Sequence, residues 1–412
     1  MLMVSDEDRS VQAAGRWRTL GILSFAIVLS MTTWFSATAI VGELRSVWSL
    51  SDGGVTWLTN AVQIGFVAGA LGASFFNLPD LIAARTLMAV SAALAAAMNL
   101  GLLVAPDAET AIVLRFLTGV ALAGIYPPAL KLVSTWFVRG RGLALGIVIG
   151  ALTVGSAFPH FLRATTESLD WQGVVAGTSA MTLLGAVLMA RYALDGPFSY
   201  PRATFNPQQI GHVLRNKPVM LANIGYFGHM WELYAMWGWF LAFIQAALLQ
   251  HGLGASVASL ATFFVIGSGF VGCVLGGVLA DRIGRTATTS IMMVISGACA
   301  GLIGFAFAGP LWLLLMIAFV WGVTVIGDSA QFSAMVTEVG EASFVGTSLA
   351  LQLGLGFALT VIAIRVLPSF ADYLGGWQWA FVMLVPGPVI GTIAMLALRR
   401  LPEAEKLAQG RR

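Results

Sequence analysis

Residues 116–124 read FLTGVALAG, and residues 319–327 read FVWGVTVIG. Both stretches share a phenylalanine, then a Gly-Val pair after two residues, then a second glycine after three more. The offset between them, 319 minus 116, is 203 residues, which is close to half of the 412-residue chain. Gly72 with Asn77 and Gly276 with Asp281 repeat a second spacing at nearly the same offset. The sequence therefore predicts two similar halves that arose by internal duplication.

The composition around these repeats is that of a membrane protein. Hydrophobic residues make up 58% of the chain and charged residues 10%, with a mean hydropathy of +0.86. A soluble domain carries about 25% charged residues, so a soluble enzyme and a disordered scaffold are both excluded. A net charge of +3 is too small to indicate a nucleic-acid partner. The two cysteines, Cys273 and Cys299, lie in apolar runs and are interpreted as small core residues.

Apolar runs bounded by charges, Pro and Gly predict an all-α membrane protein with twelve transmembrane helices in two pseudo-symmetric six-helix halves. The expected spans are residues 18–41, 54–76, 83–104, 109–132, 140–162, 170–192, 218–247, 256–279, 286–308, 310–334, 341–366 and 375–399. The expected division is an N-terminal half over 1–192, a cytoplasmic linker with a short surface helix over 193–217, and a C-terminal half over 218–412.

Basic residues predict the orientation. Eighteen of the 22 Lys and Arg residues fall on one side of the bilayer if both termini face the cytoplasm. The other side carries only Arg45, Arg163 and Arg365, so the positive-inside rule favours cytoplasmic termini. The expected location is the cell membrane, as a multi-pass monomer in contact with the lipid bilayer.

Ionisable residues inside the spans indicate a site. Arg115, Glu232 and Asp328 lie well within expected helices four, seven and ten, and His229 lies beside Glu232. Such groups are costly in hydrocarbon and normally face a bundle interior or a water-filled cavity. We therefore expect helices one, four, seven and ten to line one shared cavity between the halves.

Arg115 requires an anionic or carbonyl partner, because an arginine side chain stays charged. One interpretation is that it binds an anionic substrate or takes part in a switching ion pair. The alternative is a fixed structural bridge to carbonyl groups at a helix end. The functional interpretation is favoured, since charges buried in a membrane are usually functional.

Glu232 is the strongest candidate for proton coupling. Helical periodicity places His229 on the same face, near the bilayer midplane. Burial favours the uncharged form of both side chains, so this pair can bind and release a proton as the cavity opens to each side. The alternative is a neutral Glu232 that is hydrogen-bonded to a neighbouring helix.

Asp328 begins the sequence DSAQ and is a candidate for substrate binding or for closing an inner gate. Further candidates for substrate contact carry aromatic or amide side chains, although each alone is more often a packing residue. They are Trp34, Thr38, Gln63, Tyr126 and Gln352.

The run GGVLADRIGR, residues 276–285, resembles the signature of the major facilitator superfamily between helices eight and nine. The resemblance implies that Asp281, Arg282 and Arg285 form charge pairs at a cytoplasmic gate. In the matching loop of the first half Asn77 stands where the family has Asp. Arg115 followed by Gly119 resembles the helix-four motif of the family, which is linked to substrate binding or proton coupling.

The predicted function is secondary transport of a small polar organic solute, and more specifically of an organic anion, by proton-coupled alternating access. Symport is favoured because helix five lacks the Gly-Pro pair of the family's antiporter signature. The alternatives are a proton antiporter that exports lipophilic or cationic compounds, and a receptor or sensor on the same fold. No phosphate-binding loop occurs, and neither an enzyme nor a cofactor is expected.

Overall fold

The computed structural model describes residues 6–137, 140–165, 170–198, 205–341 and 343–412. In these residues the regular secondary structure is entirely helical. The helices of the N-terminal half are α1 (Asp6–Met31), α2 (Ser36–Ala39), α3 (Val41–Val47), α4 (Asp52–Phe75), α5 (Leu78–Leu81), α6 (Ala84–Leu100), η1 (Gly101–Val104), α7 (Ala108–Leu122), α8 (Tyr126–Ser134), α9 (Arg141–Thr165) and α10 (Trp171–Tyr192).

The remaining helices begin in the linker and continue through the second half. They are η2 (Pro207–Gln209), α11 (Ile210–Arg215), α12 (Lys217–Leu249), α13 (Ala255–Gly267), α14 (Gly269–Ile283), α15 (Arg285–Leu302), η3 (Ile303–Ala306), α16 (Leu311–Gly327), α17 (Ser329–Val339), α18 (Val345–Tyr373), η4 (Ala380–Leu384), α19 (Pro386–Arg399) and η5 (Pro402–Gly410). Of the linker, residues 199–204 lie outside the described residues.

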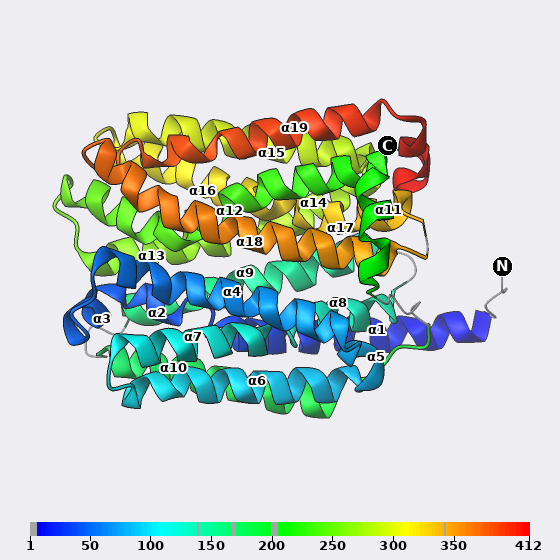
Figure 1. Cartoon of the computed structure of the whole chain (residues 1–412), viewed down its shortest axis with the longest axis horizontal. Coiled ribbons are helices and arrows are strands. Elements are labelled where there is room, and N and C mark those ends of the chain that lie inside the picture. The colour runs from blue at the N-terminus through cyan, green and yellow to red at the C-terminus, as the bar shows by residue number, and fades with distance from the viewer. Residues whose placement is uncertain (1–5, 138–139, 166–169, 199–204, 342) are drawn as a thin grey trace.

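Eleven helical segments of the described chain are long and apolar enough to cross a membrane. They correspond in order to the second to twelfth expected spans, and α1 with α2 packs beside α9 and α10 in the place of the first. Figure 1 shows α1 to α10 in one layer and α12 to α19 in another, with both termini at the same end. The all-α membrane fold predicted from the sequence is confirmed.

The prediction of one continuous first helix over residues 18–41 is wrong. Helix α1 ends at Met31 and α2 begins at Ser36. The hydroxyl groups of Thr32 and Thr33 donate to the carbonyls of Leu29 and Ser30, 2.8 and 3.4 Å away. These local bonds offer the backbone an alternative to the helical ladder, so the chain turns within the membrane.

The sequence repeat corresponds to a repeated contact between helices. A Cβ atom on Gly119 would lie 2.1 Å from the Val62 carbonyl oxygen, and one on Gly322 would lie 1.9 Å from that of Val265. Both glycines therefore let two helices approach more closely than any side chain permits. The two contacts are related by the same offset, since 322 minus 119 and 265 minus 62 are both 203.

Candidate functional site

A cavity of about 330 Å³ lies between the two halves. Its walls come from α8 and α9 of the first half and from α12, α15, α16, α17 and α18 of the second. Most of the lining is apolar, including Leu130, Ile149 and Met230, with tyrosines 126, 226 and 234 among them. The cavity can therefore hold a small solute that contacts both halves of the molecule.

Charged side chains gather at the end of the cavity nearest the C-terminal segment, where Ala408 N–H donates to Glu338. Arg285 donates to both carboxylate oxygens of Glu338 and, over 2.6 Å, to Gln331 Oε1. Arg141 donates to the carbonyls of Phe137 and Ser134, at 3.1 and 3.2 Å. Carbonyls carry no formal charge, so Arg141 keeps a positive charge at this mouth. Lys131 adds a second cation there, and its Nζ donates to the Pro79 carbonyl.

Six rings from both halves close the opposite end of the cavity, and we call this cluster the aromatic plug. It consists of Trp34, Phe35, Phe66, Tyr234, Trp237 and Phe357. The ring of Trp34 stacks on Tyr234 at 5.7 Å between centroids, and Phe66 lies 4.4 Å from Phe357. Each of these pairs joins the first half to the second. Tyr234 and Phe357 also line the cavity, so the plug forms its closed end.

Arg115 does not line the cavity. Its guanidinium is fully buried and donates to the carbonyls of Thr33, at 2.8 Å, and of Trp34. It also donates to Ser36 Oγ and Asn99 Oδ1, at 3.2 and 3.3 Å. The arginine thus occupies the break between α1 and α2, where the helix leaves carbonyls without partners. These contacts are those of the structural bridge considered above as the alternative.

The predicted polar contacts are distributed over both halves. Thr38 Oγ1 lies 3.0 Å from Thr59 Oγ1 within the first half. Gln352 donates to Asn223 and accepts from Ser333, each over 3.0 Å, within the second. Gln63 is fully buried, and neither amide atom has a hydrogen-bond partner among the described residues. Of the residues predicted to bind substrate, only Tyr126 lines the cavity.

His229 and Asp328 form a buried pair. The Nδ1 atom of His229, on α12, lies 2.9 Å from Oδ1 of Asp328, at the junction of α16 and α17. Both side chains are almost completely buried. The ring of His229 also stacks on Tyr226 at 6.0 Å, and Tyr226 lines the cavity. Tyr226 therefore contacts both His229 and the cavity.

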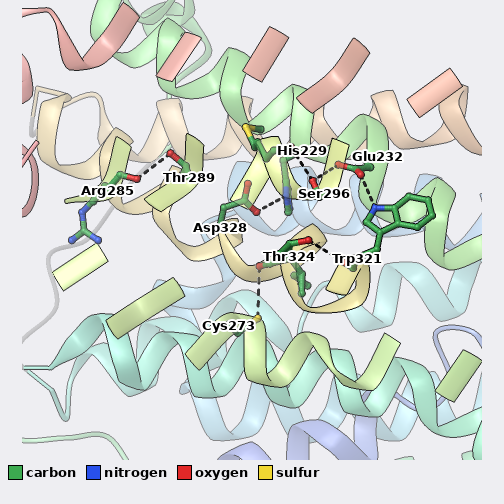
Figure 2. A network of polar contacts seen from close by, with 11 residues as sticks. His229, Glu232, Cys273, Arg285, Thr289, Ser296, Trp321, Thr324 and Asp328 are labelled. Carbon is green, nitrogen blue, oxygen red and sulfur yellow. Dashed lines mark hydrogen bonds and ion pairs between the residues drawn. The ribbon is translucent and has the colours of Figure 1, made fainter. Parts of the chain in front are cut away.

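Glu232 lies on the same helix but contacts other residues (Figure 2). Its Oε1 accepts from Trp321 Nε1 over 2.7 Å, and its Oε2 lies 2.9 Å from Ser296 Oγ. The Ser296 hydroxyl also lies 3.3 Å from the Met293 carbonyl. His229 and Glu232 thus share a face of α12 but have different partners. His229 contacts Asp328 at the junction of α16 and α17, whereas Glu232 contacts Trp321 on α16 and Ser296 on α15. Neither carboxylate lines the cavity.

The predicted gate residues have different environments. The Asp281 carboxylate lies against Gly142, where a Cβ atom would meet Oδ1 at 3.2 Å, and so joins α14 to the start of α9. Arg285 pairs with Glu338 on α17, while Arg282 is exposed and its side chain makes no hydrogen bond or ion pair within the described residues. Asn77 has a φ of 50° at the turn before α5, a left-handed conformation that asparagine tolerates.

Sequence reasoning missed several residues of this region. Tyr226, Met230, Leu233 and Tyr234 repeat at helical spacing on α12 and all line the cavity. This periodic pattern in the sequence indicates one face of a helix and could have identified the cavity wall. Trp321 lies within the repeated motif, but its bond to Glu232 depends on how α12 and α16 pack. Ser296 carries no sequence signal for that contact. Among the described residues, no group of three or more His, Cys, Asp or Glu side chains is placed to hold a metal ion.

Comparisons with known proteins agree with this architecture. A family model described as Major Facilitator Superfamily matches residues 23–354. The chain is similar to the MFS-type transporter pytF of Aspergillus terreus, with 28% identity over 176 residues that cover 41% of this chain and 56% of that protein. It is also similar to a gallate transporter of Pseudomonas putida, with 22% identity over 380 residues that cover 84% of this chain and 83% of that protein.

The fold matches that of the proton:xylose symporter XylE, with a TM-score of 0.71 and 13% identity over 94% of this chain and 96% of that one. The matched part spans 44–66% of the length of the first three curated relatives. The neighbours are membrane transporters and not enzymes, as the sequence predicted. The chain belongs to the Major Facilitator Superfamily.

Proposed function

We propose that this protein is a secondary transporter that moves a small organic anion together with a proton by alternating access. The observation that carries the proposal is the cavity that both halves line and that the aromatic plug closes at one end. A site held between two rocking halves can be exposed to one side of the membrane at a time.

The charges around the cavity favour an anion. Within the described residues, the hydrogen bonds of the Arg141 side chain go to the uncharged carbonyls of Phe137 and Ser134, whereas Arg285 is neutralised by Glu338. Glu232 and Asp328 lie behind the cavity wall, so a cation in the cavity would meet no unpaired carboxylate among the described lining residues. A volume of about 330 Å³ is at the lower end of the range for ligand pockets, which favours a small solute over a large lipophilic drug.

Buried ionisable residues support proton coupling. His229, which pairs with Asp328, stacks on Tyr226, and Tyr226 lines the cavity. Adding one proton to that pair makes its net charge one unit more positive, and this change favours an anion in the nearby cavity, where charges interact strongly away from bulk water. Joint binding of anion and proton is therefore favoured, which is symport. Glu232, buried among Trp321 and Ser296, is a second group for the same proton pathway.

We infer that the mouth of the cavity and both termini face the cytoplasm of a cell whose plasma membrane holds the protein. Figure 1 shows the two termini at one end of the molecule. The basic residues of that end, including Arg16, Arg285 and Arg399, follow the positive-inside pattern.

The test is internal pH in sealed proteoliposomes while organic anions, amino acids, sugars and cationic drugs are added outside in turn. Acidification by organic anions, absent in Glu232→Gln and retained in the control Glu109→Gln, is the expected result. Glu109 is an exposed carboxylate near the start of α7, so its replacement leaves the interior unchanged. Alkalinisation of the proteoliposome interior would indicate exchange of the solute for protons and would contradict symport. Binding of a solute without its transport would indicate a sensor.

A further inference from the structure

Several buried polar atoms around the aromatic plug have no hydrogen-bond partner in the described part of the chain. They are Nε1 of Trp34, Nε1 of Trp237, and both amide atoms of Gln63. The three side chains are 1%, 0% and 0% exposed. Buried donors without partners are rare in folded proteins because they have lost their bonds to water, so each one calls for an explanation.

The side chains that carry these atoms belong to the aromatic plug, which joins the halves, or lie one helical turn from it. Gln63 lies one turn before Phe66 on α4, and the Phe66 ring lies 5.0 Å from that of Trp34. Trp237 packs on Tyr234 at 5.5 Å, and Tyr234 in turn stacks on Trp34. A rocking motion of the two halves would separate these rings, since the contacts between Trp34 and Tyr234 cross from one half to the other.

The chemistry of the cluster selects a ligand class. An indole N–H only donates, and an amide group adds two more donors and one acceptor. Such neutral donors in a dry environment suit a carboxylate, since hydrogen bonds to a charged acceptor are stronger than neutral ones. The surrounding rings suit a flat ring, which packs against them by offset or edge-to-face contacts. A sugar has more hydroxyl groups than these few donors and one acceptor can bind. A cation cannot accept hydrogen bonds, so the indole and amide N–H groups would stay unpaired.

We propose that the aromatic plug with Gln63 is a binding site for an aromatic monocarboxylate, which forms when the two halves rock. The ring of the ligand lies among Trp34, Tyr234 and Phe357. Its carboxylate accepts from the two indole N–H groups and from the Gln63 amide. Because Tyr234 and Phe357 belong to both the cavity and the plug, the ligand passes from one to the other without leaving aromatic contact. This inference rests on the proposed function and names the substrate class for it.

The test uses the purified full chain and three probes: benzoate, cyclohexanecarboxylate and benzyl alcohol. Cyclohexanecarboxylate keeps the carboxylate without the aromatic ring, and benzyl alcohol keeps the ring without the charge. Equilibrium binding is expected to be at least about fivefold tighter for benzoate than for either analogue, from the aromatic contacts and the charged hydrogen bonds. Equal binding of cyclohexanecarboxylate, or no binding of benzoate, would overturn the proposal.

Gln63→Leu separates a binding role from a structural one. The variant removes two buried amide atoms that lack partners, so its thermal stability is expected to equal or exceed that of the parent while benzoate affinity falls about ten- to hundredfold. The matched control is Gln250→Leu, an exposed residue at the end of α12. Trp34→Phe keeps an aromatic ring and removes one hydrogen-bond donor, so benzoate affinity should also fall. Trp312→Phe is its control, because Trp312 is exposed. Reduced stability with unchanged affinity in Gln63→Leu would contradict the site.

The two proposals fail in different ways. If an aliphatic anion drives proton uptake while benzoate neither binds nor moves, the proposed function stands and the aromatic site is wrong. If benzoate binds with the expected dependence on Gln63 but moves no protons, the site stands and the coupling is wrong.

Discussion

Replacing Arg115 by methionine tests whether this buried charge supports the fold or binds substrate. Methionine keeps most of the side-chain length and removes every donor. The Trp34 carbonyl loses its guanidinium partner, at about 1–3 kcal/mol for a buried acceptor left unsatisfied. The Thr33 carbonyl keeps only the Ser36 hydroxyl, 3.1 Å away. The Thr33 carbonyl and Asn99 Oδ1 also lose a hydrogen bond from a charged group, which adds about 1.5–3 kcal/mol for each bond. The relief of burying a charge offsets part of the summed loss, so the expected destabilisation is about 2–4 kcal/mol.

This destabilisation should appear in thermal unfolding of the detergent-purified protein. Unfolding entropy is about 2 cal/mol/K per residue, so over this chain the midpoint should fall by about 2–5 °C. Arg163→Met is the control, since that arginine is partly exposed and, among the described residues, pairs with Glu43. Substrate affinity of the Arg115→Met protein that remains folded should be close to that of the parent. An unchanged midpoint with a large loss of substrate affinity would refute the structural interpretation and restore the substrate-binding one.

Three further perturbations test other parts of the account. Gly276→Ala would place a Cβ atom 1.8 Å from the Gly327 carbonyl oxygen, so it should destabilise the protein by about 1–3 kcal/mol in thermal melts, whereas Gly267→Ala, with open space around it, should not. Hydrogen bonds from Thr110 hold the pKa of the exposed Asp107 carboxyl below its ordinary value, so its stabilising effect is present above pH of about 4 and is lost as the pH falls through the folded-state pKa. The stability difference between parent and Asp107→Asn should therefore shrink in acid, and a difference that stays constant would count against this cap. Ser296 reaches both Glu232 and the Met293 carbonyl, so it can serve either protonation state of the glutamate; Ser296→Ala should narrow the pH range of transport, and a pH profile equal to that of Ser296→Thr would argue against this role.

The long apolar runs were sufficient to predict the fold class, because bilayer thickness sets their length and few other structures tolerate them. The break in the first span was not predictable in the same way. Thr and Ser hydroxyls such as those of Thr33 and Ser36 also occur in ordinary helices, and the bonds from Arg115 on α7 add to the local hydroxyl bonds in stabilising the broken conformation. Local sequence does not show that tertiary contact.

The candidate site shows the same limit at the level of side chains. Periodicity places His229 and Glu232 on one face of α12, and the structure agrees with that placement. The partners of each residue depend on which neighbouring helix it meets, and the structure supplies Asp328 for one and Trp321 with Ser296 for the other. Tyr226 and Tyr234 on α12 also repeat at helical spacing, but uncharged aromatic residues in a membrane span are common and do not by themselves indicate a cavity wall.

The central claim is that the two halves must separate at the aromatic plug for transport to occur. A cysteine pair at Thr59 and Gly238 tests this, because a Cβ atom on Gly238 would lie 3.8 Å from Thr59 Cγ2 in the opposite half. The pair is introduced into a chain whose Cys273 and Cys299 are replaced by alanine, and each single cysteine serves as a control.

Transport of the organic anion that acidifies the proteoliposomes in the first test is measured before oxidation, after oxidation, and after reduction. We expect that the cross-link abolishes transport, that reduction restores it, and that oxidation does not change transport by either single-cysteine protein. Full transport by a protein whose cross-link has formed would show that the halves need not part at this position and would contradict the account.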